Sequence, residues 1–161
     1  MTAATSAVPD QERPPADRKT SFSSFPARRK ARKRAVDVLY EAEQRDLPFT
    51  RVLDDRRDLA ERDKEMPTIP EYTTVLVEGV SMYRKEIDFE IAGAAHGWTL
   101  ARMPVVDRNI LRVAVYELRH QVDVDIPVVI SEAVKLAETL CSDDSPSFIN
   151  GVLNSLAGHQ E

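Results

Sequence analysis

The chain has 161 residues, of which 42% are hydrophobic and 30% charged, and its formal net charge is -5. The single cysteine excludes an intramolecular disulfide. No apolar run reaches the roughly 20 residues of a membrane span, and the N-terminus lacks the apolar core of a signal peptide. We therefore expect a cytoplasmic protein. Only 5 glycines are present, and the apolar patterns follow helical spacing, which predicts an all-α protein with a sizeable core.

The N-terminal residues differ in composition from the rest. Residues 1–25 are rich in Ala, Ser, Thr and Pro and nearly lack large aliphatic side chains. Such a segment cannot bury enough surface to offset its ordering entropy, so we expect a flexible tail ahead of a helical domain over residues 26–161. Pro26 suits a first helical turn, because that turn leaves its N–H groups unpaired anyway. Apolar residues then recur at three- and four-residue steps and predict a helix over residues 26–45.

This helix contains the most unusual stretch of the chain. Six cations occupy seven consecutive positions: Arg28, Arg29, Lys30, Arg32, Lys33 and Arg34. Removing them from the net charge of -5 leaves -11 on the other residues. Cations near a helix N-terminus oppose the helix dipole at roughly 0.3 to 1 kcal/mol each. Stability alone would favour Asp or Glu there, so the run predicts contact with a polyanion, and a solvated helix face is the alternative.

Two helices are predicted in the middle of the chain. Thr50 can cap a helix that runs to about residue 64, before a proline-containing break. A longer helix is predicted over residues 70–95, because apolar side chains recur along it at four-residue spacing. Gly79 inside that helix costs about 1 kcal/mol relative to Ala, which indicates a close crossing with another helix.

The C-terminal part completes a set of about seven helices. Residues 98–104 predict a short turn of helix, and residues 105–118 are apolar over too wide a surface for one stripe, so this helix should be central. An amphipathic helix ends near residue 140. Ser145 can then cap the last helix, with Pro146 at the first helical position.

Motifs for catalysis are missing from the sequence. The chain has no CxxC, HExxH or GxxxxGK[ST] motif, and its three histidines are far apart. Neighbouring acidic residues such as Asp143 and Asp144 are typical of solvated surfaces and helix caps. We therefore expect no enzyme activity, no cofactor and no metal site.

Four blocks of sequence, in this order, carry a family resemblance. They begin with Ala27–Arg32 followed by Ala35–Val36 and Leu39–Tyr40, and continue with Val106–Leu118, Ile126–Val134 and Asp144–Leu153. Together they resemble the NusB family of bacterial transcription antitermination factors. The resemblance covers about residues 26–157.

The resemblance implies an all-α fold of two small helical subdomains that share a core, without catalysis. It also implies binding of single-stranded boxA-type RNA together with NusE, a small-subunit ribosomal protein. In this family such binding is part of an RNA polymerase antitermination complex that supports elongation through ribosomal operons and ribosomal RNA synthesis.

The same resemblance implies roles for particular residues. The arginine-rich first helix of the family contacts RNA, which implies that role for Arg28, Arg29, Lys30 and Arg32, with Lys33 and Arg34 as additional cations. Further RNA contacts are implied for Tyr40, Asp144, Ser145 and Phe148. Asp107 occupies an acidic position that faces NusE in the family. Physically, cations would bind phosphates while aromatic rings stack on unpaired bases.

Several alternatives stay open at this point. Tyr40 and Phe148 can be ordinary core aromatics, and Ser145 can be only a helix cap. Ser147 stands where relatives often have a basic residue, so we expect weak RNA binding that NusE tightens. The rival function is a helical protein-interaction scaffold without specific RNA binding, and a homodimer is also left open.

Overall fold

The computed structural model describes residues 25–158, so the tail predicted over residues 1–25 lies outside the described residues, apart from the backbone of Phe25. Within this range all regular structure is helical, as predicted. The helices are α2 (Phe25–Arg45), α3 (Phe49–Arg62), α4 (Glu71–Met82), α5 (Arg84–Ala94), the short 3-10 helix η1 (Leu100–Arg102), α6 (Val105–His120), α7 (Ile126–Leu140) and α8 (Ser145–Ala157). None of the described helices is long and apolar enough to cross a bilayer.

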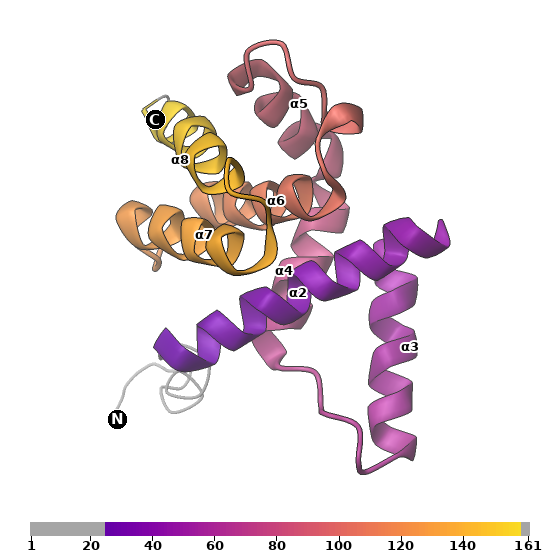
Figure 1. Cartoon of the computed structure of the whole chain (residues 1–161). Coiled ribbons are helices and arrows are strands. Elements are labelled where there is room, and N and C mark those ends of the chain that lie inside the picture. The colour runs from indigo at the N-terminus through magenta and orange to yellow at the C-terminus, as the bar shows by residue number, and fades with distance from the viewer. Residues whose placement is uncertain (1–24, 159–161) are drawn as a thin grey trace, which may run out of the picture.

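Helix α6 lies at the centre of the fold, as its wide apolar surface predicted. It packs against α2, α4, α5, α7 and α8, and every residue from Asn109 to Leu118 is buried. Helices α2, α3 and α4 pack on one another, and α5 to α8 form a second group. Figure 1 shows α2 running across the molecule, with α3 near its C-terminal end and α7 near its N-terminal end. The buried side chains of both groups form one continuous core.

The close helix crossing predicted at Gly79 is present between α4 and α6. A Cβ atom added at Gly79 would lie 2.2 Å from Cε1 and Cζ of the Tyr116 ring. No real Cβ contact is that short, so glycine is what lets the ring of Tyr116 lie against the α4 backbone.

The single helix predicted over residues 70–95 is wrong in one respect, because it is divided into α4 and α5. Tyr83 lies between them with φ -106° and ψ 22°, outside the helical region. Its ring stacks on His120 at the end of α6, with 4.1 Å between ring centroids. The apolar spacing continues through Tyr83, so the break redirects α5 over α6 and α8 without disturbing the buried stripe.

The predicted cap of the second helix is also wrong. Helix α3 begins at Phe49, directly after Pro48, and no side chain caps it. Thr50 is therefore already inside the first turn. Phe49 is buried at this start, beneath the guanidinium groups of Arg84 and Arg112 at 4.6 and 5.7 Å from the ring centroid. Burial of Phe49 and the fixed φ of proline place the helix start two residues earlier than a cap at Thr50 would.

A buried ion-pair network fixes the C-terminal half of α2 to α6. Glu43 accepts hydrogen bonds from Arg108, from Asn109 at 2.9 Å and from Arg112 at 2.7 Å. Arg112 also pairs with Asp88 of α5 at 2.9 and 3.0 Å. Burial by itself raises the pKa of Glu43, but the hydrogen bonds from Arg108 and Asn109 and the charges of both arginines outweigh it and lower this pKa to about 2.

This low pKa predicts how stability depends on pH. Because the ordinary pKa is 4.5, the charged Glu43 stabilises the fold fully above about pH 4.5, and its contribution disappears as the pH falls toward 2. We expect Glu43→Gln to lower the free energy of unfolding by up to about 3 kcal/mol at pH 7. In urea unfolding the difference between the two proteins should shrink from pH 4.5 downward. A difference that stayed constant to pH 3 would contradict this assignment.

Candidate nucleic-acid interface

The six cations of α2 separate by helical phase. Arg28 and Arg32 are 6% and 3% exposed, because they lie on the same side of the helix as the buried Ala31 and Ala35. The other four lie outside this buried face: Arg29, Lys30 and Lys33 are exposed and Arg34 is half-buried.

The two buried arginines pair with acidic groups of the protein itself, Arg32 with the buried Glu117 and Arg28 with the exposed Asp123. Arg32 Nε donates to both carboxylate oxygens of Glu117 on α6 at 2.9 and 3.0 Å. The hydroxyl of Tyr72 donates to the same carboxylate at 2.5 Å, and burial followed by the charge of Glu117 raises the pKa of Tyr72. Arg28 pairs with Asp123 at 2.9 Å and lies 4.4 Å from the Tyr72 ring centroid. Both guanidinium groups therefore have internal partners.

Arg29 shares features of the buried arginines and of the solvent-facing cations. Its side chain is half exposed, yet it donates two hydrogen bonds to the buried Glu132 of α7, at 2.9 and 2.8 Å. These hydrogen bonds lower the pKa of Glu132 against the effect of its burial. The unfavourable position of cations at this helix N-terminus thus has a structural explanation at three of the six positions. Excess positive charge facing solvent comes from Lys30, Lys33 and Arg34.

Further along α2, Tyr40 lies on the solvent side of the helix. It is 42% exposed, so the interpretation as a core aromatic is wrong for Tyr40. A groove of about 590 Å³ runs beside it between α2 and the region of α3 and the loop that follows. Residues lining this groove include Arg34, Asp37, Tyr40, Gln44, Arg56, Met66 and Pro67.

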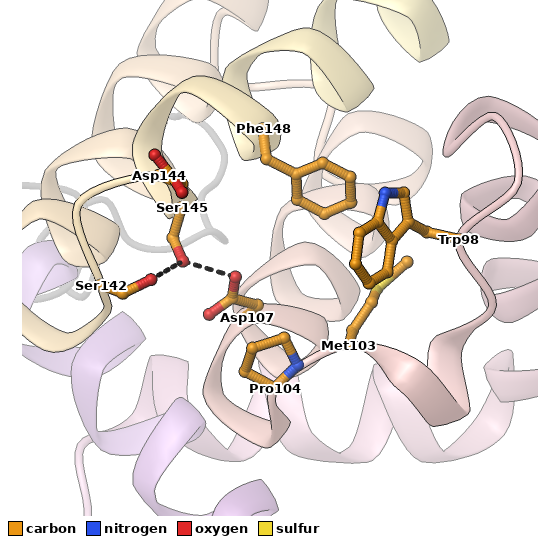
Figure 2. Close-up of a pocket in the computed structure, with 8 residues that line it drawn as sticks. All are labelled: Trp98, Met103, Pro104, Asp107, Ser142, Asp144, Ser145 and Phe148. Carbon is orange, nitrogen blue, oxygen red and sulfur yellow. Dashed lines mark hydrogen bonds between the residues drawn. The ribbon is translucent and has the colours of Figure 1, made fainter.

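A second hollow, of about 320 Å³, lies beside the start of α8 (Figure 2). Its lining residues are Trp98, Met103, Pro104, Asp107, Ser142, Asp144, Ser145 and Phe148. The half-buried ring of Phe148 meets the ring of Trp98 edge to face, with 6.4 Å between centroids. Apolar side chains therefore form one side of this hollow, and hydroxyl and carboxylate groups form the other.

Ser145 is not the cap of α8. Asp144 is the residue before the helix and is already in the helical region at φ -85° and ψ -16°. The buried Ser145 hydroxyl donates instead to Asp107 Oδ2 at 2.6 Å (Figure 2). Asp107 is itself only 4% exposed, and burial together with Asp107 raises the pKa of the Cys141 thiol to about 12. The contacts of Asp107 are thus internal, and its role toward NusE stays a prediction.

The two hollows are joined by a third one of about 330 Å³. It shares Tyr40 and Gln44 with the groove beside α2, and it shares Pro104, Asp107 and Ser142 with the hollow beside α8. One continuous surface therefore contains Arg34, Tyr40, Asp107, Asp144, Ser145 and Phe148, all of which the sequence singled out. We call this the α2–α8 surface.

The sequence interpretation did not include Trp98 in this surface. The available signal was the position of an aromatic residue in a connector, outside any helical apolar stripe. Among residues 25–158 no three His, Cys, Asp or Glu side chains gather in a way that would suit a metal ion.

Comparison with known proteins identifies the family of the chain. Residues 29–158 match the sequence profile of the NusB family. The chain belongs to the NusB family. The transcription antitermination protein NusB of Salinispora arenicola (strain CNS-205) is 51% identical over 134 residues, which cover 83% of this chain and 96% of that protein. NusB proteins are non-enzymatic transcription antitermination factors, which confirms that this chain is not an enzyme.

Solved structures of the NusB family share the fold. T. maritima NusB has a TM-score of 0.72 and 30% identity, over 83% of this chain and 92% of that one. A structure described as antitermination factors NusB and NusE in complex with dsRNA has a TM-score of 0.70 and 26% identity, over 85% of this chain and 100% of its counterpart.

Proposed function

We propose that this chain binds single-stranded boxA-type RNA of ribosomal operons together with NusE, and thereby supports elongation by RNA polymerase and ribosomal RNA synthesis. The related NusB in the complex with NusE and dsRNA supports RNA binding together with that partner. The preference for boxA and the assembly with RNA polymerase are the finer parts of this proposal.

The observation that carries the proposal is the α2–α8 surface. It joins Arg34, at the end of the basic run of α2, to exposed aromatic rings through continuous hollows. Cations that bind phosphates and rings that stack on bases are the two components of single-strand recognition. Because Arg28 and Arg32 are themselves buried and each already pairs with a carboxylate of the protein, the proposal assigns phosphate contacts first to Lys30, Lys33 and Arg34, with Arg29 beside them.

Replacing Lys30, Lys33 and Arg34 together by alanine should weaken RNA binding without unfolding the protein. Each phosphate contact on a single strand contributes roughly -0.7 to the slope of log affinity against log salt, so the slope should become shallower by about 2. Fluorescence anisotropy of a labelled boxA-type strand over a salt series, with circular dichroism as the folding check, measures both quantities.

A matched control removes three exposed cations elsewhere: Arg62, Lys64 and Lys85. We expect this control to keep the salt slope of the unmodified protein. A scrambled strand tests sequence preference, and titrations with and without NusE test whether the partner tightens binding. Equal slopes for the two triple variants would contradict the proposed surface.

A protein-interaction scaffold remains the rival function, because Met82 and Phe89 are 74% and 81% exposed on α4 and α5. Binding to a protein partner with no binding of either RNA strand, in the presence or absence of NusE, would favour that function over ours.

A further inference from the structure

Trp98 is an unusual side chain for a surface connector. It is the only tryptophan in the chain and it is 51% exposed. Large aromatic rings usually bury most of their area, and an exposed ring beside a hollow marks a place where a ligand can cover it. The ring of Trp98 lies at the rim of the hollow beside α8, next to Phe148, whose ring it meets edge to face (Figure 2).

The connector that carries Trp98 is held in a fixed conformation. His96 and Gly97 both have positive φ, of 48° and 95°, and turn the chain directly ahead of Trp98. Arg108 of α6 then donates hydrogen bonds to the carbonyl oxygens of Leu100 and Met103, at 3.1 and 3.0 Å. Because the connector is anchored to the core, Trp98 is presented without a large ordering cost on binding.

The hollow suits a neutral aromatic ligand better than an anion. Its polar side carries the carboxylates of Asp107 and Asp144, which would repel a phosphate group. Its apolar side offers two aromatic rings, on which a nucleobase can stack. Its volume of about 320 Å³ lies within the range of small-ligand sites.

The guanidinium group of Arg102 lies over the same ring. The guanidinium carbon of Arg102 lies 5.8 Å from the centroid of the Trp98 ring, and no carboxylate in residues 25–158 forms an ion pair with Arg102. This arrangement leaves Arg102 ready to contact a phosphate while a base occupies the hollow. The hollow is also continuous with the groove beside Tyr40, so one strand can reach both.

We propose that Trp98 and Phe148 form the walls of a pocket for one unpaired RNA base, and that Arg102 binds the phosphate of that nucleotide. This inference rests on the proposed RNA-binding function and extends the α2–α8 surface to the α5–α6 connector. Its occupant is a nucleotide of single-stranded RNA.

The single tryptophan allows a direct test. Unlabelled boxA-type RNA is titrated into the unmodified protein in the presence of NusE, and tryptophan fluorescence is recorded. The same titration into NusE alone is subtracted, and the remaining signal is the emission of Trp98. In parallel, a labelled strand reports binding by anisotropy. We expect Trp98 emission to decrease and to saturate at the RNA concentration at which anisotropy saturates. Anisotropy that reports binding while Trp98 emission stays constant would overturn the pocket and leave the proposed function intact.

Variants give a second, independent measurement. Trp98→Ala should weaken RNA binding roughly tenfold or more, whereas Trp98→Phe, which keeps a ring, should lose much less. Arg102→Ala should make the salt slope shallower by about 0.7. The controls are Phe89→Ala, an exposed aromatic outside the three hollows, and Arg62→Ala, an exposed arginine on α3. Both should bind RNA as the unmodified protein does.

Other outcomes separate the possible failures. Trp98→Ala that binds RNA normally would overturn the pocket, and so would a loss confined to NusE binding, since the ring would then contact a protein. If no protein in the series binds RNA with or without NusE, the proposed function fails and the pocket fails with it.

Discussion

Replacing Arg32 by alanine is expected to lower the free energy of unfolding by roughly 3 to 5 kcal/mol, the usual cost of breaking a buried ion pair from one side. The pair of Arg32 and Glu117 is 3% and 1% exposed, and the variant would leave the carboxylate of Glu117 buried without its arginine counterion, with the Tyr72 hydroxyl as the hydrogen-bond donor described for it in residues 25–158. Urea unfolding at pH 7, followed by circular dichroism, measures the loss.

The neighbouring residue supplies the control. Lys33 is half exposed and its only described ion pair is a 3.4 Å contact with Asp37, so Lys33→Ala should change stability by less than about 1 kcal/mol. The double variant Arg32→Met with Glu117→Gln should recover much of the lost stability, because no charge is then left unpaired and Tyr72 keeps an acceptor. Similar losses for the two single variants would contradict the division of the cations into buried and solvent-facing sets.

The second large effect is expected at Gly79. An alanine there would place Cβ 2.2 Å from the ring of Tyr116, so the ring or helix α4 must move. Overpacking of a well-packed core costs roughly 2 to 3 kcal/mol, which exceeds the approximately 1 kcal/mol that alanine gains in helix propensity. We therefore expect Gly79→Ala to be clearly destabilising in thermal or urea unfolding.

Gly93 in α5 is the matched control. A Cβ atom at Gly93 would meet nothing within 4 Å, so Gly93→Ala should stabilise the protein by up to about 1 kcal/mol through helix propensity alone. Combining Gly79→Ala with Tyr116→Leu should reduce the penalty at Gly79, because the ring atoms at the contact are removed. If the two alanine variants changed stability in the same direction, the crossing would not explain the glycine at position 79.

Periodicity predicted the features that depend on neighbours along the chain. The wide apolar surface of residues 105–118 predicted the central position of α6. The glycine at position 79, which is unfavourable inside a helix, predicted the close crossing. The break at Tyr83 could not be predicted in this way, because the buried stripe passes through it without a change of spacing. At this break the Tyr83 ring stacks on His120, which is 37 positions along the chain and adjacent only in the folded protein.

The candidate site shows the same limit of sequence periodicity, which does not predict contacts between distant parts of the chain. Periodicity treats arginine as a surface residue, whereas Arg28 and Arg32 continue the buried face of α2 toward its N-terminus. Asp123, in the loop after α6, is 95 residues from Arg28, and Glu117 on α6 is 85 residues from Arg32. A usable signal was present in Glu117, an acidic residue inside an otherwise apolar helical surface, because such a residue needs a cation from elsewhere in the fold.

The burial of alternate arginines in α2 makes the order of the basic run as important as its charge. A shift of the run by one residue turns every cation by about 100° around the helix axis. Such a shuffled chain would have the same isoelectric point and the same number of basic residues. A shift of one residue toward the C-terminus would nevertheless put an alanine at position 32 and leave Glu117 without its counterion in the interior, so amino-acid content alone cannot identify a functional equivalent of this helix.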